Sequence, residues 1–192
     1  QAANERVPAL LYLAGLTCNE ETFAIKAGAQ RMAASLGLAL IAPDTSPRGA
    51  AVEALPGASA SWDFGIGAGF YLDATEAPWA AHWRMESWIV QELLPLVGRQ
   101  FAIDTARLGI FGHSMGGHGA LTLALRHPGR FLSLSAFAPI CAPTQCPWGD
   151  KALRGYLGEP GDDRAAWLAH DASALMQSQV AAPYPHGILV DQ

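Results

Sequence analysis

The segment at residues 108–121, which reads LGIFGHSMGGHGAL, constrains the fold of this chain more than any other. A short apolar run leads into Gly-His-Ser-Met-Gly and then into small, helix-forming residues. This order predicts a strand, a sharp turn and a helix, with Ser114 at the tip of the turn, as in a nucleophile elbow. Glycine is expected at positions 112 and 116, because such a turn brings strand and helix too close for side chains.

A serine in this place is suited to acyl transfer. The N–H of Met115 would lie in the first turn of the helix, where unpaired donors and the positive end of the helix dipole can hold an oxyanion. A second donor is expected from the backbone N–H of Leu16, in the loop after the first strand. The alternative is a glycine-rich turn that only begins a helix, but the strand-to-helix context favours the nucleophile.

Strands and helices alternate along the chain. Apolar runs predict strands at residues 9–14, 38–42, 108–111, 132–138 and 187–191. Helical spacing predicts helices at residues 25–36, 83–97 and 115–126, with Pro95 near the end of the second. This order predicts an α/β fold, a mostly parallel sheet flanked by helices in three α/β/α layers.

Functional loops should gather at the carboxyl edge of such a sheet. The segments expected there are residues 15–18, 44–49, 114, 139–148 and 191–192. Residues 45–78 form a long stretch rich in Gly and Pro, whose aromatic residues predict an ordered, packed loop. Its glycines at 65, 67 and 69 follow no strand, which argues against a dinucleotide site. Residues 139–179 are expected to form an insertion with short helices.

A serine nucleophile needs a histidine base and an acid that orients it. None of the six histidines is an evident base. His127 would lie about 18 Å along the helix from the turn, and His186 precedes a strand. His113 is expected to point away from the serine and His118 to hydrogen-bond locally, whereas His170 in the insertion stays open.

Asp191 is the one acid that follows a late strand, although an aspartate there could simply cap the next turn. In α/β-hydrolases the acid and then the histidine come after such strands. We therefore expect residues 1–192 to be part of a single catalytic domain, without its C-terminal acid and histidine loops and some N-terminal strands.

The three cysteines point to other chemistry only weakly. Cys18 is an alternative nucleophile without an evident partner histidine. Cys141 and Cys146 lack the spacing and the second pair of a zinc site, so neither a metal nor a cofactor is expected. Three cysteines are too few for a disulfide framework, which favours a reducing compartment, the cytoplasm.

Composition excludes several classes of protein. Half of the residues are hydrophobic, 15% are charged and the net charge is −5, which fits a compact globular chain. No Lys/Arg run suggests nucleic acid or an anionic membrane, and no apolar stretch is long enough for a membrane span.

Several stretches together resemble the S-formylglutathione hydrolase family, also called esterase D, of the α/β-hydrolase superfamily. They read GLTC from residue 15, APDTSPRG from 42, WDFGIGAGFYLDATE from 62, FGHSMGGHGAL from 111, SAFAPIC from 135 and CPWG from 146.

The resemblance implies a cytoplasmic, often homodimeric serine thioesterase. Such an enzyme hydrolyses S-formylglutathione to formate and glutathione in formaldehyde detoxification and also acts on small carboxylic esters. By position Ser114 matches the nucleophile, and Met115 and Leu16 match the oxyanion-hole amides. Trp62 and Trp148 are expected as walls of a small acyl pocket beside Cys18, although ordinary loop packing explains them equally well.

Four alternatives stay open at this point. An acyltransferase or a general carboxylesterase of the same fold would use the same elbow. A non-catalytic α/β domain, or an inactive fragment that associates through its sheet edge, would not use Ser114 at all.

Overall fold

The computed structural model describes residues 5–181, 184 and 187–192. Within them, five parallel strands form one sheet in the order β2-β1-β3-β4-β5. The strands are β1 (Val7–Leu13), β2 (Ala39–Ile41), β3 (Ile103–His113), β4 (Ser133–Phe137) and β5 (Leu189–Asp191). The predicted parallel sheet is confirmed, and the strand predicted at 108–111 is the inner part of a longer β3.

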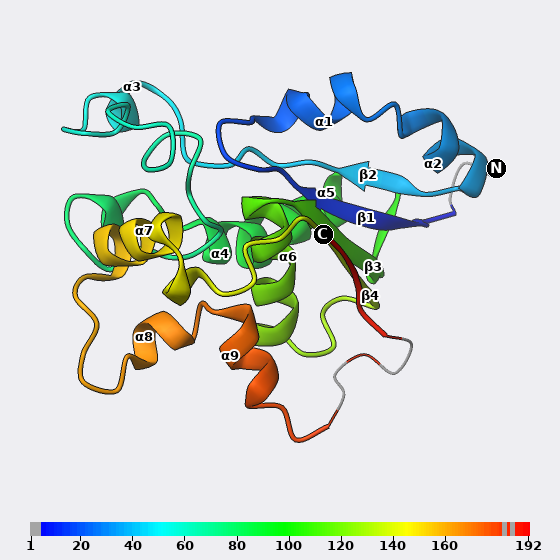
Figure 1. Ribbon diagram of the computed structural model, residues 1–192. Coiled ribbons are helices and arrows are strands. Elements are labelled where there is room, and N and C mark those ends of the chain that lie inside the picture. Colours follow the sequence, from blue (N-terminus) through cyan, green and yellow to red (C-terminus); the bar gives the residue numbers. More distant parts are fainter. Residues whose placement is uncertain (1–4, 182–183, 185–186) are drawn as a thin grey trace.

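Helices cover both faces of the sheet, as the three-layer prediction requires. In Figure 1, α1 and α2 lie on one side of the strands, and α6 to α9 lie on the other. The helices are α1 (Glu20–Lys26), α2 (Gln30–Leu36), α3 (Ala50–Glu53), η1 (Trp79–Ala81), α4 (Met85–Ser87), η2 (Trp88–Leu93), α5 (Leu94–Gln100), α6 (Met115–Arg126), η3 (Pro143–Gln145), α7 (Pro147–Leu157), α8 (Ala165–Leu168) and α9 (Ala172–Gln177). The elements from η3 to α9 confirm the predicted insertion with short helices.

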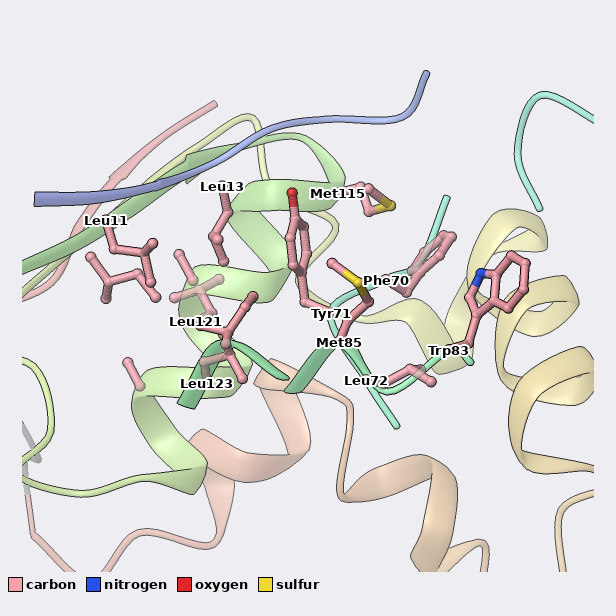
Figure 2. Close-up of a cluster of buried hydrophobic side chains, with 14 of the residues drawn as sticks. Leu11, Leu13, Phe70, Tyr71, Leu72, Trp83, Met85, Met115, Leu121 and Leu123 are labelled. Atoms are coloured by element: carbon pink, nitrogen blue, oxygen red, sulfur yellow. The ribbon is translucent and has the colours of Figure 1, made fainter. Parts of the chain in front are cut away.

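Alternate side chains of β1 point to the two opposite faces of the sheet. Leu11 and Leu13 are fully buried and point toward Leu121 and Leu123 of α6 (Figure 2). Tyr12 points to the other face, where its ring stacks on Phe23 of α1 with the centroids 4.0 Å apart. Both faces of the central strand are therefore covered, which explains its continuous apolar run.

The helix predicted at residues 25–36 is wrong in its boundaries, because the structure has two short helices there. Asn19 caps the first with a capping box, so α1 begins before the apolar spacing that was used for the prediction. Gly28 then adopts a positive φ of 60°, which breaks the helical path before α2 begins. The predicted end at Gly37 is confirmed, since this residue is the left-handed C-cap.

Pro95 does not lie near the end of its helix as predicted. The helical path runs from Met85 to Gln100 and widens to a π-helix over Trp88–Leu93, with the Leu94 N–H bonded to the Ile89 carbonyl. A proline has no N–H and its ring crowds the carbonyl four residues earlier. The wider turn immediately before Pro95 relieves that crowding, so the helix continues.

The long stretch at residues 45–78 is packed against the core, as its aromatic residues predict. Phe70, Tyr71 and Leu72 are almost completely buried, and Figure 2 shows Tyr71 beside Leu13 and Met115. The Tyr71 hydroxyl donates to the Ala14 carbonyl over 2.8 Å. This loop therefore supports the end of β1 from within the core.

Among the described residues, no helix combines the length and the apolar character that a membrane span requires.

Candidate active site

The strand order reverses direction beside β1. From β1 the chain moves outward to β2 and then returns across β1 to form β3 on its other side. Neighbouring loops diverge at such a switch point, which leaves a crevice at the carboxyl ends of the strands. The loop after β1 and the turn after β3 meet here, since a Cβ added to Gly15 would lie 3.2 Å from the Ser114 Cβ.

Close backbone contacts explain the glycines of the elbow. A Cβ at Gly112 would lie 2.1 Å from the Gly116 carbonyl oxygen, and one at Gly116 would lie 1.9 Å from the Leu13 carbonyl oxygen. Both distances are impossible for real atoms, and backbone cannot move aside as a flexible side chain can. The steric requirement for glycine that was inferred from the sequence is thus explained by two backbone carbonyl oxygens, those of Gly116 and Leu13.

Ser114 adopts the strained conformation that an elbow requires. Its φ of 57° and ψ of −120° lie outside the regions that L-residues prefer. Bonds on either side hold the residue, because its N–H donates to the Phe137 carbonyl over 2.9 Å and its carbonyl accepts from the His118 N–H over 3.0 Å. The strain is therefore stabilised by β4 on one side and by α6 on the other.

Two backbone amides next to Ser114 have no acceptor among the described residues. These are the N–H of Met115, the first residue of α6, and the N–H of Leu16 in the loop after β1. Buried backbone donors are nearly always paired, so free donors at the edge of a cavity are available to a ligand. Their place beside the serine is suited to a developing oxyanion.

A network of hydrogen bonds fixes the loop after β1. Thr17 has a φ of 67°, and its N–H donates to the Gly67 carbonyl over 2.9 Å. The Cys18 carbonyl accepts from the Thr45 hydroxyl and, over 3.2 Å, from the Arg48 guanidinium. The loop that carries the Leu16 amide is thus anchored by the two segments that follow β2.

The glycine run at residues 65–69 takes part in this support. A Cβ at Gly67 would lie 3.2 Å from the Thr17 Cα, and the Gly65 N–H already donates to the Tyr156 hydroxyl over 2.9 Å. These glycines allow close backbone packing, which accounts for their occurrence without a dinucleotide.

Ser114 opens into a cavity of about 570 Å³. The lining is mostly apolar and comes from four of the five predicted loops. It consists of Gly15, Leu16, Cys18, Trp62, His113, Ser114, Ala138, Pro139, Ile140, Cys141, Ala142, Cys146, Trp148 and Gln192. The prediction that Trp62, Trp148 and Cys18 lie near the serine agrees with this placement.

The segment at residues 44–49 does not reach this cavity, contrary to its predicted place in the site. Asp44 and Arg48 line a separate cavity of about 420 Å³ with His82, Arg84 and other residues of the α4 region. The reason is that Thr45 and Arg48 turn back to hold the Cys18 carbonyl. This segment supports the site from behind.

No described histidine forms a hydrogen bond with the Ser114 hydroxyl. His113 is exposed on the lining of the same cavity, whereas His127 lies at the far end of α6. His170 is buried and lines another cavity, beside Glu86 and Arg126. His186 lies outside the described residues.

His118 was expected to hydrogen-bond locally, but among the described residues the backbone groups that favour its protonation belong to Phe70 and Ile140, on other segments of the chain. Both ring nitrogens are buried without a partner of good geometry, and the ring lies edge-on to Phe70 at 5.9 Å. Burial lowers the pKa of His118 to about 4, although the nearby Asp171 carboxylate acts in the opposite direction. The imidazole is therefore neutral at pH 7.

Asp191 lies at the predicted edge of the sheet but has no partner among the described histidines. Its backbone carbonyl accepts from the Ala138 N–H over 2.6 Å, while its side chain is exposed and does not line the Ser114 cavity. Gln192, the next residue, does line it. The role of Asp191 as the acid stays a prediction.

Three supporting residues escaped the sequence analysis. Tyr71 holds the end of β1, and Lys151 bonds to Asp63 beside Trp62. The positions of Tyr71 and Asp63 within an aromatic-rich loop were the only available signal, because their partners lie far away in the sequence.

The comparisons with known proteins agree with this geometry. The chain is 50% identical over 192 residues to an S-formylglutathione hydrolase of Rattus norvegicus, and 51% identical over 191 residues to one of Paracoccus denitrificans. Both matches cover 100% of this chain but 65% of the relative. The chain thus spans slightly less than two thirds of their length.

Solved structures show the same fold. An S-formylglutathione hydrolase from Agrobacterium tumefaciens matches with a TM-score of 0.89 at 48% identity, over 100% of this chain and 66% of that one. A fluorophosphonate-binding serine hydrolase from Staphylococcus aureus matches with a TM-score of 0.70 at 19% identity, over 99% of this chain and 66% of that one. The predicted α/β-hydrolase fold is confirmed. Since the model of the Esterase family, described as "Putative esterase", matches residues 1–192, this chain belongs to the Esterase family.

Proposed function

We propose that this chain carries the nucleophile and the oxyanion hole of a serine thioesterase. The enzyme hydrolyses S-formylglutathione to glutathione and formate and also acts on small carboxylic esters. One observation carries the proposal: Ser114 is held in a strained turn at a cavity, beside the amides of Leu16 and Met115, which have no acceptor in the described part of the chain. The approximately half-identical relatives with this activity supply the substrate.

The reaction follows from these groups. The Ser114 oxygen attacks the thioester carbonyl carbon while a base takes the hydroxyl proton. The carbonyl oxygen becomes an oxyanion that accepts hydrogen bonds from the two amides, each worth roughly 10² to 10³ in rate. Collapse of the intermediate expels the glutathione thiolate, which takes up a proton, and leaves a formyl ester on Ser114. Water then attacks this ester while the base takes a proton from it, and formate leaves as the Ser114 oxygen regains a proton.

We infer that the base, and the acid that orients it, are residues that the described structure does not show in contact with Ser114. Residues 1–192 would then be one part of a single α/β-hydrolase domain, as the greater length of the relatives suggests. Asp191 is the candidate acid within this chain, since it ends β5 at the same edge of the sheet. The intact mass of the expressed protein, compared with 20.3 kDa for these residues, tests the inference.

The cavity lining suits a small acyl group. Trp62, Trp148 and Cys18 form walls beside Ser114, and a formyl group needs little room. Among the described residues, the lining holds no Lys or Arg side chain. The charged ends of glutathione would therefore stay outside the cavity, in solvent.

We also propose a cytoplasmic location, a role in formaldehyde catabolism and a homodimer. The three cysteines are free thiols, which suits a reducing compartment. The dimer and the pathway rest on the resemblance to S-formylglutathione hydrolases. Light scattering of the purified protein tests the dimer, and a monomer at micromolar concentration would contradict it.

A fluorophosphonate probe tests the nucleophile, and S-formylglutathione tests the substrate. We expect the probe to label Ser114, and Ser114→Ala to abolish the label. We expect release of glutathione in proportion to formate, because water is the acceptor. Labelling at Cys18 in place of Ser114, or no hydrolysis of the thioester by a labelled protein, would overturn the proposal.

A further inference from the structure

Two exposed tryptophans face each other at the mouth of the Ser114 cavity. Trp62 is 57% exposed and Trp148 is 46% exposed, and their rings meet edge to face at 6.4 Å and 71°. They come from different parts of the chain, the loop after α3 and the first turn of α7. An edge-to-face aromatic pair contributes only about 0.5 to 1.5 kcal/mol, and polar contacts between the two segments add to it here.

Lys151 joins the two segments. It lies on α7 one turn after Trp148, and its ammonium donates to the Ser61 hydroxyl over 2.7 Å and to the Asp63 carboxylate. The Ser61 hydroxyl also donates to Asp63. The residues immediately before and after Trp62 are thus both tied to the helix that carries Trp148.

The carboxylate of this cluster is well suited to a fixed contact. The Asp63 side chain is only 12% exposed, and bonds from Lys151 and Ser61 hold its pKa below the usual value. Farther along the loop, the Phe64 ring stacks on Tyr156 of α7 at 4.4 Å. The loop therefore contacts α7 at Trp62 and at Phe64 as well as through the polar cluster.

We propose that Lys151 is a positioning residue. Through Asp63 and Ser61 it fixes Trp62 against Trp148, and the fixed pair sets the longest acyl group that reaches Ser114. This inference rests on the proposed esterase function and adds a determinant of its acyl specificity. Without the ammonium, Asp63 loses its partner, the loop around Trp62 moves away from α7, and the mouth widens.

Neutral esters provide the cleanest test. The loss of Lys151 also leaves the Asp63 charge unpaired, which would repel an anionic glutathione thioester whatever the position of Trp62. p-Nitrophenyl acetate and p-nitrophenyl hexanoate carry no charge and differ only in acyl length. The ratio of their kcat/KM values therefore reports the width of the mouth.

We expect Lys151→Met to raise the relative use of hexanoate about three- to tenfold. Asp63→Asn should act in the same direction. Lys151→Arg should retain most of the selectivity of the parent, because it keeps the cation. The matched control is Arg154→Met, which removes exposed ion pairs from the same helix and should leave the ratio unchanged. Labelling of Ser114 and thermal unfolding report whether each variant is folded.

A double variant shows whether Lys151 acts through Trp62. We expect Lys151→Met to have no further effect on the ratio in a Trp62→Ala background, since there is no indole left to position. Two results would overturn the inference and leave the proposed function intact. One is an additive effect of the two substitutions in the double variant. The other is an unchanged ratio in both Lys151→Met and Asp63→Asn when these variants are folded and active. The esters are assayed with the whole enzyme, which supplies the base and the acid, and if it hydrolysed neither ester the proposed function itself would fail.

Discussion

The two ends of helix α6 differ in whether their polar groups have partners. At the Ser114 end, the Met115 amide is unpaired among the described residues and the serine faces a cavity. At the other end, Arg126 and His127 both bind one carboxylate, that of Glu86. Pairing stabilises one end, and under the proposed function the other end binds the substrate. We therefore expect stability and activity to be separable along this helix.

The paired end joins three segments of the chain. The Arg126 Nε lies 3.0 Å and 3.1 Å from the two Glu86 oxygens, and its Nη1 donates to the Ala169 carbonyl over 2.9 Å. The His127 Nε2 lies 2.8 Å from Glu86. A cationic group at the carboxyl end of a helix also interacts favourably with the helix dipole.

Substitution of the serine should separate the two ends most strongly. We expect Ser114→Ala to lower kcat by about 10⁶, because the nucleophile is lost. Thermal unfolding should stay within a few degrees of the parent, because the hydroxyl makes no hydrogen bond among the described residues. A large loss of stability would show that the active end also contributes to the fold.

Glu86→Gln tests the paired end. We expect a loss of about 2 to 3 kcal/mol in the free energy of unfolding, because a largely buried cation loses its partner. This is less than for a fully buried pair, since Arg126 is 28% exposed. Turnover per fluorophosphonate-labelled serine should not change. The matched control, Glu159→Gln, breaks an exposed pair with Arg154 and should cost less than about 0.5 kcal/mol.

The buried histidines near α6 make a smaller, pH-dependent contribution. Burial lowers the pKa of His118 to about 4 and that of His170 to about 3, from 6.5. Below pH 6.5 these histidines bind protons in the unfolded chain but stay neutral in the folded protein, so the free energy of unfolding falls as the pH falls. Each imidazole contributes up to about 1.4 kcal/mol per pH unit in this window.

Unfolding measured at pH 7 and pH 5 checks this expectation. His118→Gln should reduce the dependence on pH, whereas the exposed His82→Gln should leave it as in the parent. An equal dependence in His118→Gln and in the parent would mean that His118 is protonated in the folded state.

The smallest expected effect concerns the mouth of the cavity. Trp148→Ala should lower the preference for formyl over butyryl thioesters roughly tenfold, because the larger acyl group gains room. The kcat/KM values for the two thioesters measure this preference. An unchanged preference in a folded, labelled variant would assign Trp148 to loop packing only.

Short-range features of the chain could be predicted from its sequence. The elbow, the strands and the Gly37 cap depend on residues that are neighbours along the chain. The break at Gly28 and the wide turn before Pro95 were missed, because apolar spacing alone continues through both. The periodic pattern therefore predicted that helices exist, but not where each is interrupted.

Contacts between distant segments could not be predicted. Nothing near Glu86 in the sequence indicates that it meets Arg126 and His127, and nothing near Lys151 indicates Asp63. The burial of His118 is also a tertiary effect, since its neighbours Phe70 and Asp171 belong to other segments. Such contacts depend on how the loops pack, which a single sequence does not reveal.

The close approach at Gly116 limits how this protein can vary. The atom that opposes any side chain there is the Leu13 carbonyl oxygen, which every amino acid at position 13 would present in the same place. Gly155 differs, because its obstacle is the Phe64 ring, and a smaller residue at position 64 could make room. A second-site suppressor is therefore conceivable for a substitution at Gly155, whereas no exchange of side chains elsewhere can rescue one at Gly116.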